Sequence, residues 1–211
     1  MIHYMFRFDV MSHIAQYKAI AIVREKTADR GRQVASAVVK AGLGAVEVTC
    51  TTPAAFDIIE GMRGQAAVIG AGTVLSPSEA VSAAHAGATF IVTPNVDADV
   101  IRTAHRHGLA AIIGCGTASE IVTALELGAD AIKVFPAEQL GMGFLGAIHG
   151  PLPWAPLIPV GGVDPSNAAA WLAAGGLAVG MGSRLTAGDD ATITTNVQTL
   201  LKNIGVAPLT A

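Results

Sequence analysis

A lysine stands inside an apolar run of the sequence. Residues 130–138 read DAIKVFPAE, and the residues on either side of Lys133 are of the kind that form a buried strand. Burial lowers the pKa of a lysine from its usual value of about 10.4, and the neutral amine can then attack a ketone to form a Schiff base. The protonated imine withdraws electrons, so a neighbouring C–C bond can break. Lys133 is therefore our candidate nucleophile.

Imine chemistry of this kind also needs a group that moves protons beside the nitrogen. Glu47 is the only acidic residue inside any of the strands that the sequence predicts. Because strand side chains alternate between two faces, Glu47 shares a face with Ala45 and Thr49, and Lys133 shares one with Ala131. We expect both charged side chains to point inward, and we expect Thr49, at the end of the same strand as Glu47, to contact the substrate. A structural ion pair is the alternative, which we rank second because buried pairs often contribute little net stability.

Short apolar segments rich in Val and Ile recur roughly every 20–26 residues. They are continuously apolar, as strands covered on both faces are. The predicted strands are 19–24, 45–49, 67–73, 90–94, 110–114, 131–136, 157–162 and 177–182.

Helical patterns separate these strands. Ser76 and Thr117 are each followed three residues later by glutamate, which is the signature of a capping box at a helix start. Eight β-α units in one chain predict an α/β fold, a single-domain (β/α)8 barrel over residues 1–211. Residues 1–18 would form an extra helix that caps the barrel, and 189–205 the last outer helix. A doubly wound open sheet is the rival fold, and it would use fewer strands.

Barrels of this type place their sites at the carboxyl ends of the strands. Gly161 and Gly162 end the seventh predicted strand, and Gly182 and Ser183 end the eighth. Loops at these two positions often bind phosphate through backbone N–H groups, and glycine lets the backbone approach a ligand closely. Tight turns alone would also explain the glycines.

Composition narrows the classes of function. The chain has 211 residues, a formal net charge of −3 and 14% charged residues, with no basic cluster of the kind that binds nucleic acid. No apolar run reaches the length of a membrane span, and the first residues lack the pattern of a signal peptide. Cys50 and Cys115 provide neither a disulfide framework nor zinc spacing. We expect a cytoplasmic protein that binds neither nucleic acid nor membrane.

Several motifs occur in order: VEVTCTTP, IGAGTVLSP, IVTPN, GCGTASE, KVFPAE, PVGGVDPSN and GMGS. Together they resemble the 2-keto-3-deoxy-6-phosphogluconate (KDPG) aldolase family over residues 18–186. The family includes the 4-hydroxy-2-oxoglutarate (KHG) aldolases and the 2-keto-3-deoxy-6-phosphogalactonate aldolases. The resemblance implies a class I aldolase with this barrel, without metal or other cofactor, and typically a homotrimer.

The resemblance also implies roles for individual residues. Lys133 matches the Schiff-base lysine and Glu47 the general acid and base. Residues matching the substrate site are Thr73 and Pro94 in the pyruvyl pocket, Phe135 beside the lysine, and Gly161, Gly162, Gly182 and Ser183 at the phosphate.

Two positions depart from the gluconate-type pattern. Thr51 stands where that pattern has an arginine for the substrate carboxylate, and Val160 stands where it commonly has threonine. Arg24, at the end of the first predicted strand, could bind the carboxylate instead. Asn95 could contact substrate hydroxyls or simply shape its loop.

These residues predict a lyase that splits a 2-keto-3-deoxy-6-phospho sugar acid, of the 6-phosphogluconate or 6-phosphogalactonate type, into pyruvate and glyceraldehyde 3-phosphate. One alternative with the same chemistry cleaves 4-hydroxy-2-oxoglutarate to pyruvate and glyoxylate. More distant alternatives are a phosphate-binding barrel epimerase without an imine, and a phosphosugar-binding barrel without catalysis.

Overall fold

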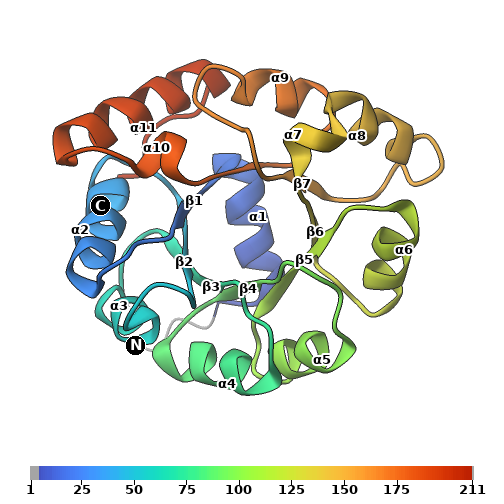
Figure 1. The fold of residues 1–211 in the computed structure, drawn as a ribbon, viewed down its shortest axis with the longest axis horizontal. Coiled ribbons are helices and arrows are strands. Elements are labelled where there is room, and N and C mark those ends of the chain that lie inside the picture. The colour runs from blue at the N-terminus through green and yellow to red at the C-terminus, as the bar shows by residue number, and fades with distance from the viewer. Residues whose placement is uncertain (1–4, 211) are drawn as a thin grey trace.

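Eight parallel strands form the centre of the molecule (Figure 1). The computed structural model describes residues 5–210. The strands are β1 (Ala19–Val23), β2 (Ala45–Thr49), β3 (Val68–Gly72), β4 (Phe90–Val92), β5 (Ala110–Cys115), β6 (Ala131–Val134), β7 (Leu157–Pro159) and β8 (Val179–Met181).

The strands close into a barrel. They are paired in the order β7-β6-β5-β4-β3-β2-β1-β8, and a parallel bridge between Val160 and Gly180 joins the two ends of that order. The predicted (β/α)8 barrel is therefore confirmed, and the open doubly wound sheet is wrong. The observed strands are mostly shorter than predicted at their carboxyl ends, because the last predicted residues already belong to turns.

Helices surround the barrel on the outside, as Figure 1 shows. They are α2 (Ala28–Lys40), α3 (Ala55–Gly61), α4 (Pro77–Ala86), α5 (Ala98–Arg106), α6 (Ala118–Glu126), α7 (Ala137–Leu140), α8 (Met142–His149), α9 (Ala168–Ala173), α10 (Ser183–Thr186) and α11 (Asp190–Ile204). Over residues 5–210, none of the helices has the length and apolar character that a membrane span requires.

Local sequence explains where the longer helices begin. The Ser76 hydroxyl accepts a hydrogen bond from the Glu79 amide, and the Glu79 side chain accepts one from the Ser76 amide, so this capping box is confirmed. The Thr117 hydroxyl likewise accepts from the Glu120 amide. The sequence analysis missed α10, since a helix of four residues is too short to show periodicity.

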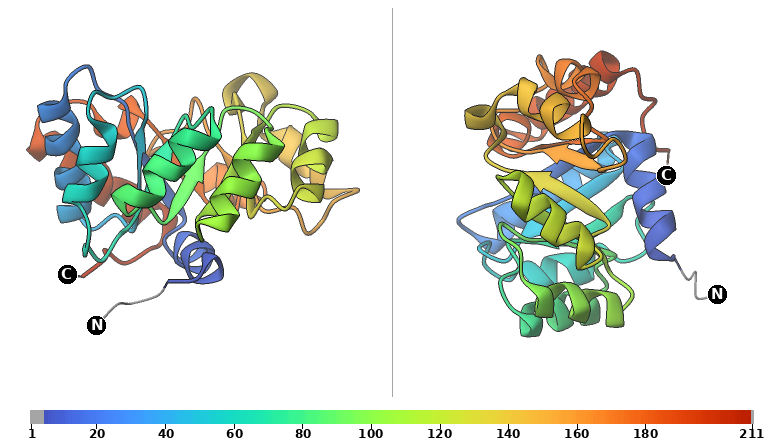
Figure 2. Two further views of the ribbon diagram at one scale, coloured as in Figure 1. Left: turned by 90° about the horizontal axis from the view of Figure 1, so that it is seen from below. Right: turned by 90° about the vertical axis from the view of Figure 1, so that its right-hand side faces the viewer.

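Helix α1 (Arg7–Tyr17) lies across the end of the barrel opposite the strands' carboxyl ends (Figure 2). Val10 and Ile14 are fully buried in the barrel interior. Asp130 fixes the helix, because its carboxylate accepts hydrogen bonds from Arg7 Nη1 at 3.0 Å and from the Ala111 amide at 2.8 Å. The extra helix was predicted over 1–18, of which residues 1–4 lie outside the described part of the chain.

Two hydrophobic clusters confirm the predicted alternation along the strands. Ala45 and Ala131 belong to the cluster inside the barrel, which also holds the ring of Phe90. Ile132 and Val134 belong to the larger cluster between strands and helices. Glu47 and Lys133 therefore project from the inward-facing positions of β2 and β6.

Candidate active site

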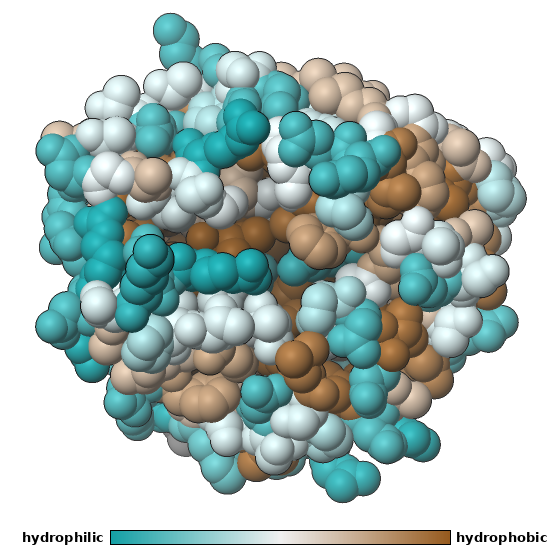
Figure 3. Space-filling view, in the orientation of Figure 1, coloured by the Kyte–Doolittle hydropathy of each residue, from teal (hydrophilic) through white to brown (hydrophobic). Residues whose placement is uncertain are grey.

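Lys133 lies at the edge of a cavity of about 490 Å³ at the carboxyl ends of the strands. Only 5% of the residue is exposed. Nine residues predicted for the site line this one cavity: Arg24, Thr73, Pro94, Lys133, Phe135, Gly161, Gly162, Gly182 and Ser183. In the space-filling view, apolar side chains form the base of a central hollow and hydrophilic ones border it (Figure 3).

An aromatic ring accompanies the lysine. The Lys133 Nζ lies 5.2 Å from the centre of the Phe135 ring, within the range of a cation–π contact. The Phe135 side chain is partly exposed at the cavity, which is the position expected for an aromatic residue beside the lysine.

Glu47 lies beside the cavity but does not line it. The residue is 2% exposed, and its Oε1 has no hydrogen-bond partner among the described residues. Burial raises the pKa of the Glu47 carboxyl, whereas the positive charges of Lys133 and Arg24 lower it by a smaller amount. A buried carboxyl with a raised pKa and an unpaired oxygen is suited to accept and release a proton.

Gly72 of β3 makes room for the Glu47 side chain. Glu47 is paired with Gly70, and a Cβ added to Gly72 would lie 1.8 Å from Glu47 Oε1. Any side chain at residue 72 would thus displace the carboxylate. The sequence analysis did not identify this role, although glycine inside a strand is a signal of close approach by another group.

Arg24 and Thr73 form a polar wall of the cavity. Arg24 Nη2 donates a hydrogen bond to Thr73 Oγ1 at 3.2 Å. Thr73 has a φ of 56°, in the left-handed region that a β-branched residue rarely adopts. Such an uncommon conformation next to a cavity is typical of a residue held in place for binding.

Thr49 is not brought to the cavity. The residue is fully buried, and its hydroxyl is hydrogen-bonded to those of Thr51 and Thr52. The Thr52 hydroxyl in turn donates to the carbonyl of Val23. This network ties the β2–α3 turn to β1, so the structure gives Thr49 a structural environment instead of the expected position against substrate.

The glycine turn after β7 presents an unused donor to the cavity. Gly161 and Gly162 have φ values of 100° and 74°, which favour glycine. The Gly161 carbonyl accepts from the Glu138 amide, whereas the N–H of Gly162 donates to no described protein group. Gly182 and Ser183 lie across the same cavity at the start of α10.

Arg184 is a cavity residue that the sequence analysis missed. It directly follows the predicted Gly182–Ser183 pair, and this neighbouring position in the sequence could have indicated that Arg184 lines the site. Together with Arg24 and Lys133 it gives the cavity three cationic side chains, and no carboxylate lines it. The arrangement favours an anionic ligand.

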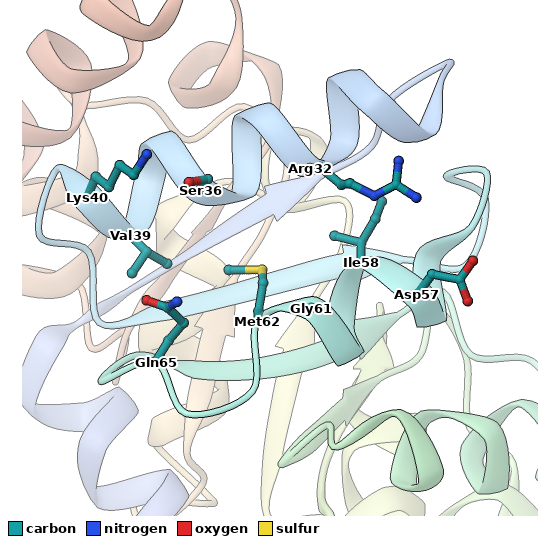
Figure 4. Close-up of a pocket in the computed structure, with 9 residues that line it drawn as sticks. All are labelled: Arg32, Ser36, Val39, Lys40, Asp57, Ile58, Gly61, Met62 and Gln65. Atoms are coloured by element: carbon teal, nitrogen blue, oxygen red, sulfur yellow. The ribbon is translucent and has the colours of Figure 1, made fainter.

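A second cavity, of about 260 Å³, lies on the outside of the barrel between α2 and α3 (Figure 4). Met62 and Ile58 form its apolar part, and Arg32, Lys40 and Asp57 lie around it. None of the residues predicted for catalysis or binding lines this cavity, so the chemistry belongs to the cavity at the strand ends.

Comparisons with known proteins identify relatives of this chain. The family model described as "KDPG and KHG aldolase" matches residues 10–200. The 2-dehydro-3-deoxy-6-phosphogalactonate aldolase of Escherichia coli K12 is 41% identical over 170 residues, 79% of this chain and 83% of that protein. The 2-dehydro-3-deoxy-phosphogluconate aldolase of Treponema pallidum is 32% identical, over 93% of this chain and 98% of that protein.

The fold agrees with a solved structure as well. A structure described as native KDPGal superposes with a TM-score of 0.82 at 37% sequence identity, covering 88% of this chain and 93% of the other. The match to the family model spans nearly the whole barrel, including the strand ends that carry the lysine and the glycine turns. This chain therefore belongs to the KDPG and KHG aldolase family of carbon–carbon lyases.

Proposed function

We propose that this protein is a class I aldolase that cleaves a 2-keto-3-deoxy-6-phospho sugar acid into pyruvate and glyceraldehyde 3-phosphate. The observation that carries the proposal is the buried Lys133 amine, which opens into an anion-binding cavity with Glu47 close by. Neither an epimerase nor a simple binding protein would need this lysine and carboxyl together.

The first step is imine formation. Once the Lys133 amine has given up its proton, its Nζ attacks the C2 ketone of the substrate, and the carbinolamine that results loses water to give a protonated Schiff base. The imine nitrogen then carries the positive charge that draws electrons from the C3–C4 bond. This electron sink is organic, so the proposed mechanism assigns no step to a metal.

Glu47 then moves the protons. The C4 hydroxyl loses its proton to the Glu47 carboxylate through a water molecule, because Glu47 lies next to the cavity and does not line it. The C3–C4 bond breaks, C4 becomes the aldehyde of glyceraldehyde 3-phosphate, and C3 becomes the methylene carbon of an enamine. Return of a proton to C3 and hydrolysis of the imine release pyruvate and the free lysine.

The cavity offers a group for each end of the substrate. We assign the C1 carboxylate to Arg24 and Thr73, whose side chains already contact each other. We assign the phosphate to the turns at Gly161–Gly162 and Gly182–Ser183, where the N–H groups of Gly162 and Gly182 donate to no described group. Pro94 and Phe135 would enclose the pyruvyl part between these ends.

Among substrates of this class we place the 6-phosphogalactonate type first. The phosphogalactonate aldolase relative is 41% identical to this chain, whereas the phosphogluconate aldolase relative is 32% identical. Cleavage of 4-hydroxy-2-oxoglutarate is a second activity to test, since the matching family model includes KHG aldolases. We also propose, from the family resemblance, a homotrimer in the cytoplasm.

The experiment is a pyruvate-release assay with the two C4 epimers of the phosphorylated acid and with 4-hydroxy-2-oxoglutarate. A higher kcat/KM for the phosphogalactonate-type acid supports the proposal. Release of pyruvate from none of the three would overturn it. Light scattering of the same preparation measures the oligomeric state.

A further inference from the structure

Arg184 lines the end of the active-site cavity that the glycine turns form. It is the second residue of α10, directly after Ser183, and it lines the same cavity as Gly162. Its guanidinium makes one hydrogen bond to described residues, from Nη1 to Asp164 Oδ2 at 3.3 Å. A guanidinium has five N–H donors, so most of them remain free for a ligand.

Asp164 orients this guanidinium. Its Oδ1 accepts hydrogen bonds from the Ser166 amide and hydroxyl and from the Asn167 amide, so the carboxylate is fixed at the start of the segment that leads into α9. Those bonds and the Arg184 charge hold the pKa of Asp164 below its usual value. The remaining oxygen thus offers the arginine a permanent negative partner beside the cavity.

The two arginines that line the cavity contact different parts of the barrel. Arg24 extends from β1 to Thr73 at the end of β3, whereas Arg184 is held toward Asp164 in the segment after β7. The proposed substrate likewise has two anionic groups at opposite ends, a carboxylate and a phosphate. The carboxylate end is matched by Arg24, and the phosphate end lacks a cation unless Arg184 supplies it.

We propose that Arg184 binds the substrate phosphate and sets the preference of the enzyme for phosphorylated over unphosphorylated sugar acids. A planar guanidinium suits a phosphate because it can donate two parallel hydrogen bonds. The contact with Asp164 does not prevent this, because the Arg184 side chain is 57% exposed and a single exposed ion pair is weak. The inference rests on the proposed function and adds a specificity residue to it.

The test compares Arg184→Ala with the unaltered enzyme on two substrates, the phosphorylated 2-keto-3-deoxy sugar acid and the same acid without its phosphate. Loss of a hydrogen bond to a charged group corresponds to about a tenfold to hundredfold rise in KM for the phosphorylated acid. The kcat for that substrate should change little, because the phosphate is remote from the bond that breaks. With the unphosphorylated acid, kcat/KM should stay the same.

Two further variants sharpen the result. Arg184→Lys keeps the charge but loses the planar fork, so its KM should lie between those of the alanine variant and the unaltered enzyme. Arg102→Ala removes another exposed arginine, which forms an ion pair with Asp99 on α5 and does not line the cavity, and it should change neither substrate's KM.

An equal loss with both substrates, or no loss with either, would overturn the role of Arg184. Failure of the proposed function looks different, because the unaltered enzyme would then release no pyruvate from either acid and form no borohydride-trapped adduct with pyruvate. Since pyruvate has no phosphate, the Arg184→Ala protein should still form that adduct.

Discussion

The side chain of Glu47 occupies the space that a Cβ of Gly72 would fill, with Oε1 at 1.8 Å from the position of that carbon. The two residues lie on the adjacent strands β2 and β3, and the inward position of Glu47 depends on the absence of a side chain there. Gly72 is thus a positioning residue for the proposed proton-transfer group.

Substitution Gly72→Ala should lower kcat by at least about a hundredfold, because moving a catalytic group by one ångström has an effect of that size. Overpacking should also lower the free energy of unfolding by about 1–3 kcal/mol. Both quantities are measurable by steady-state kinetics and urea unfolding. The matched control is Gly61→Ala at the end of α3, where an added Cβ meets nothing within 4 Å. Unchanged kcat in Gly72→Ala would contradict the placement of Glu47.

Substitution Glu47→Gln should change how stability depends on pH. Burial raises the folded-state pKa of Glu47 above the ordinary value of 4.5. The folded protein therefore keeps this proton to a higher pH than the unfolded chain does. The stability that the bound proton contributes is fully present below the unfolded-state pKa. It is lost as the pH rises through the folded-state pKa. Relative to the unaltered protein, the Gln variant should gain Tm as the pH rises above about 4.5.

The matched control for that experiment is Glu126→Gln at the end of α6, because it makes the same change at an exposed position. A Glu47→Gln protein whose Tm difference stays constant across the range would show that burial does not disfavour the Glu47 charge.

How far the sequence predicted this site can be judged from individual residues. Lys133 and Glu47 were found because charged residues are conspicuous inside apolar strands, and alternation then gave their direction. Thr49 was expected on the same face by the same rule. Alternation alone did not place Thr49 at the cavity, because its hydroxyl pairs with those of Thr51 and Thr52 where the chain turns after β2.

Features that depend on contacts distant in the sequence were not predictable. Arg184 is an ordinary arginine in a short segment until the barrel closes and brings α10 to the turn after β7. The role of Asp130 is similar, because its partners Arg7, His105 and Ala111 come from three different elements. The barrel itself was predictable, since strand periodicity and helix caps are local signals.

Replacing Asp130 should lower the stability of the protein without changing its activity. Asp130→Ala removes the acceptor for Arg7, His105 and the Ala111 amide at the end of the barrel opposite the cavity. We expect the free energy of unfolding to fall by about 2 kcal/mol, since the buried Ala111 amide loses its partner. At a temperature where the variant is folded, kcat/KM should not change. Asp99→Ala, which breaks an exposed ion pair on α5, should cost much less stability.

Arg24 should control the affinity for the carboxylate. Arg24→Gln should raise the pyruvate concentration that gives half-maximal trapping by borohydride about tenfold or more, as expected for loss of a charge-assisted hydrogen bond. Arg102→Gln is the control, because that arginine is exposed on α5. An unaltered trapping curve for Arg24→Gln would move the carboxylate site to another part of the cavity.

The central claim is that the Lys133 amine forms the imine. The direct measurement is incubation of the protein with pyruvate and sodium borohydride, followed by mass spectrometry of its peptides. We predict a reduced pyruvyl adduct on Lys133, and none on the other lysines Lys18, Lys26, Lys40 and Lys202. Lys133→Met should form no adduct. A folded protein that acquires no adduct on Lys133, or acquires it elsewhere, would contradict the imine mechanism.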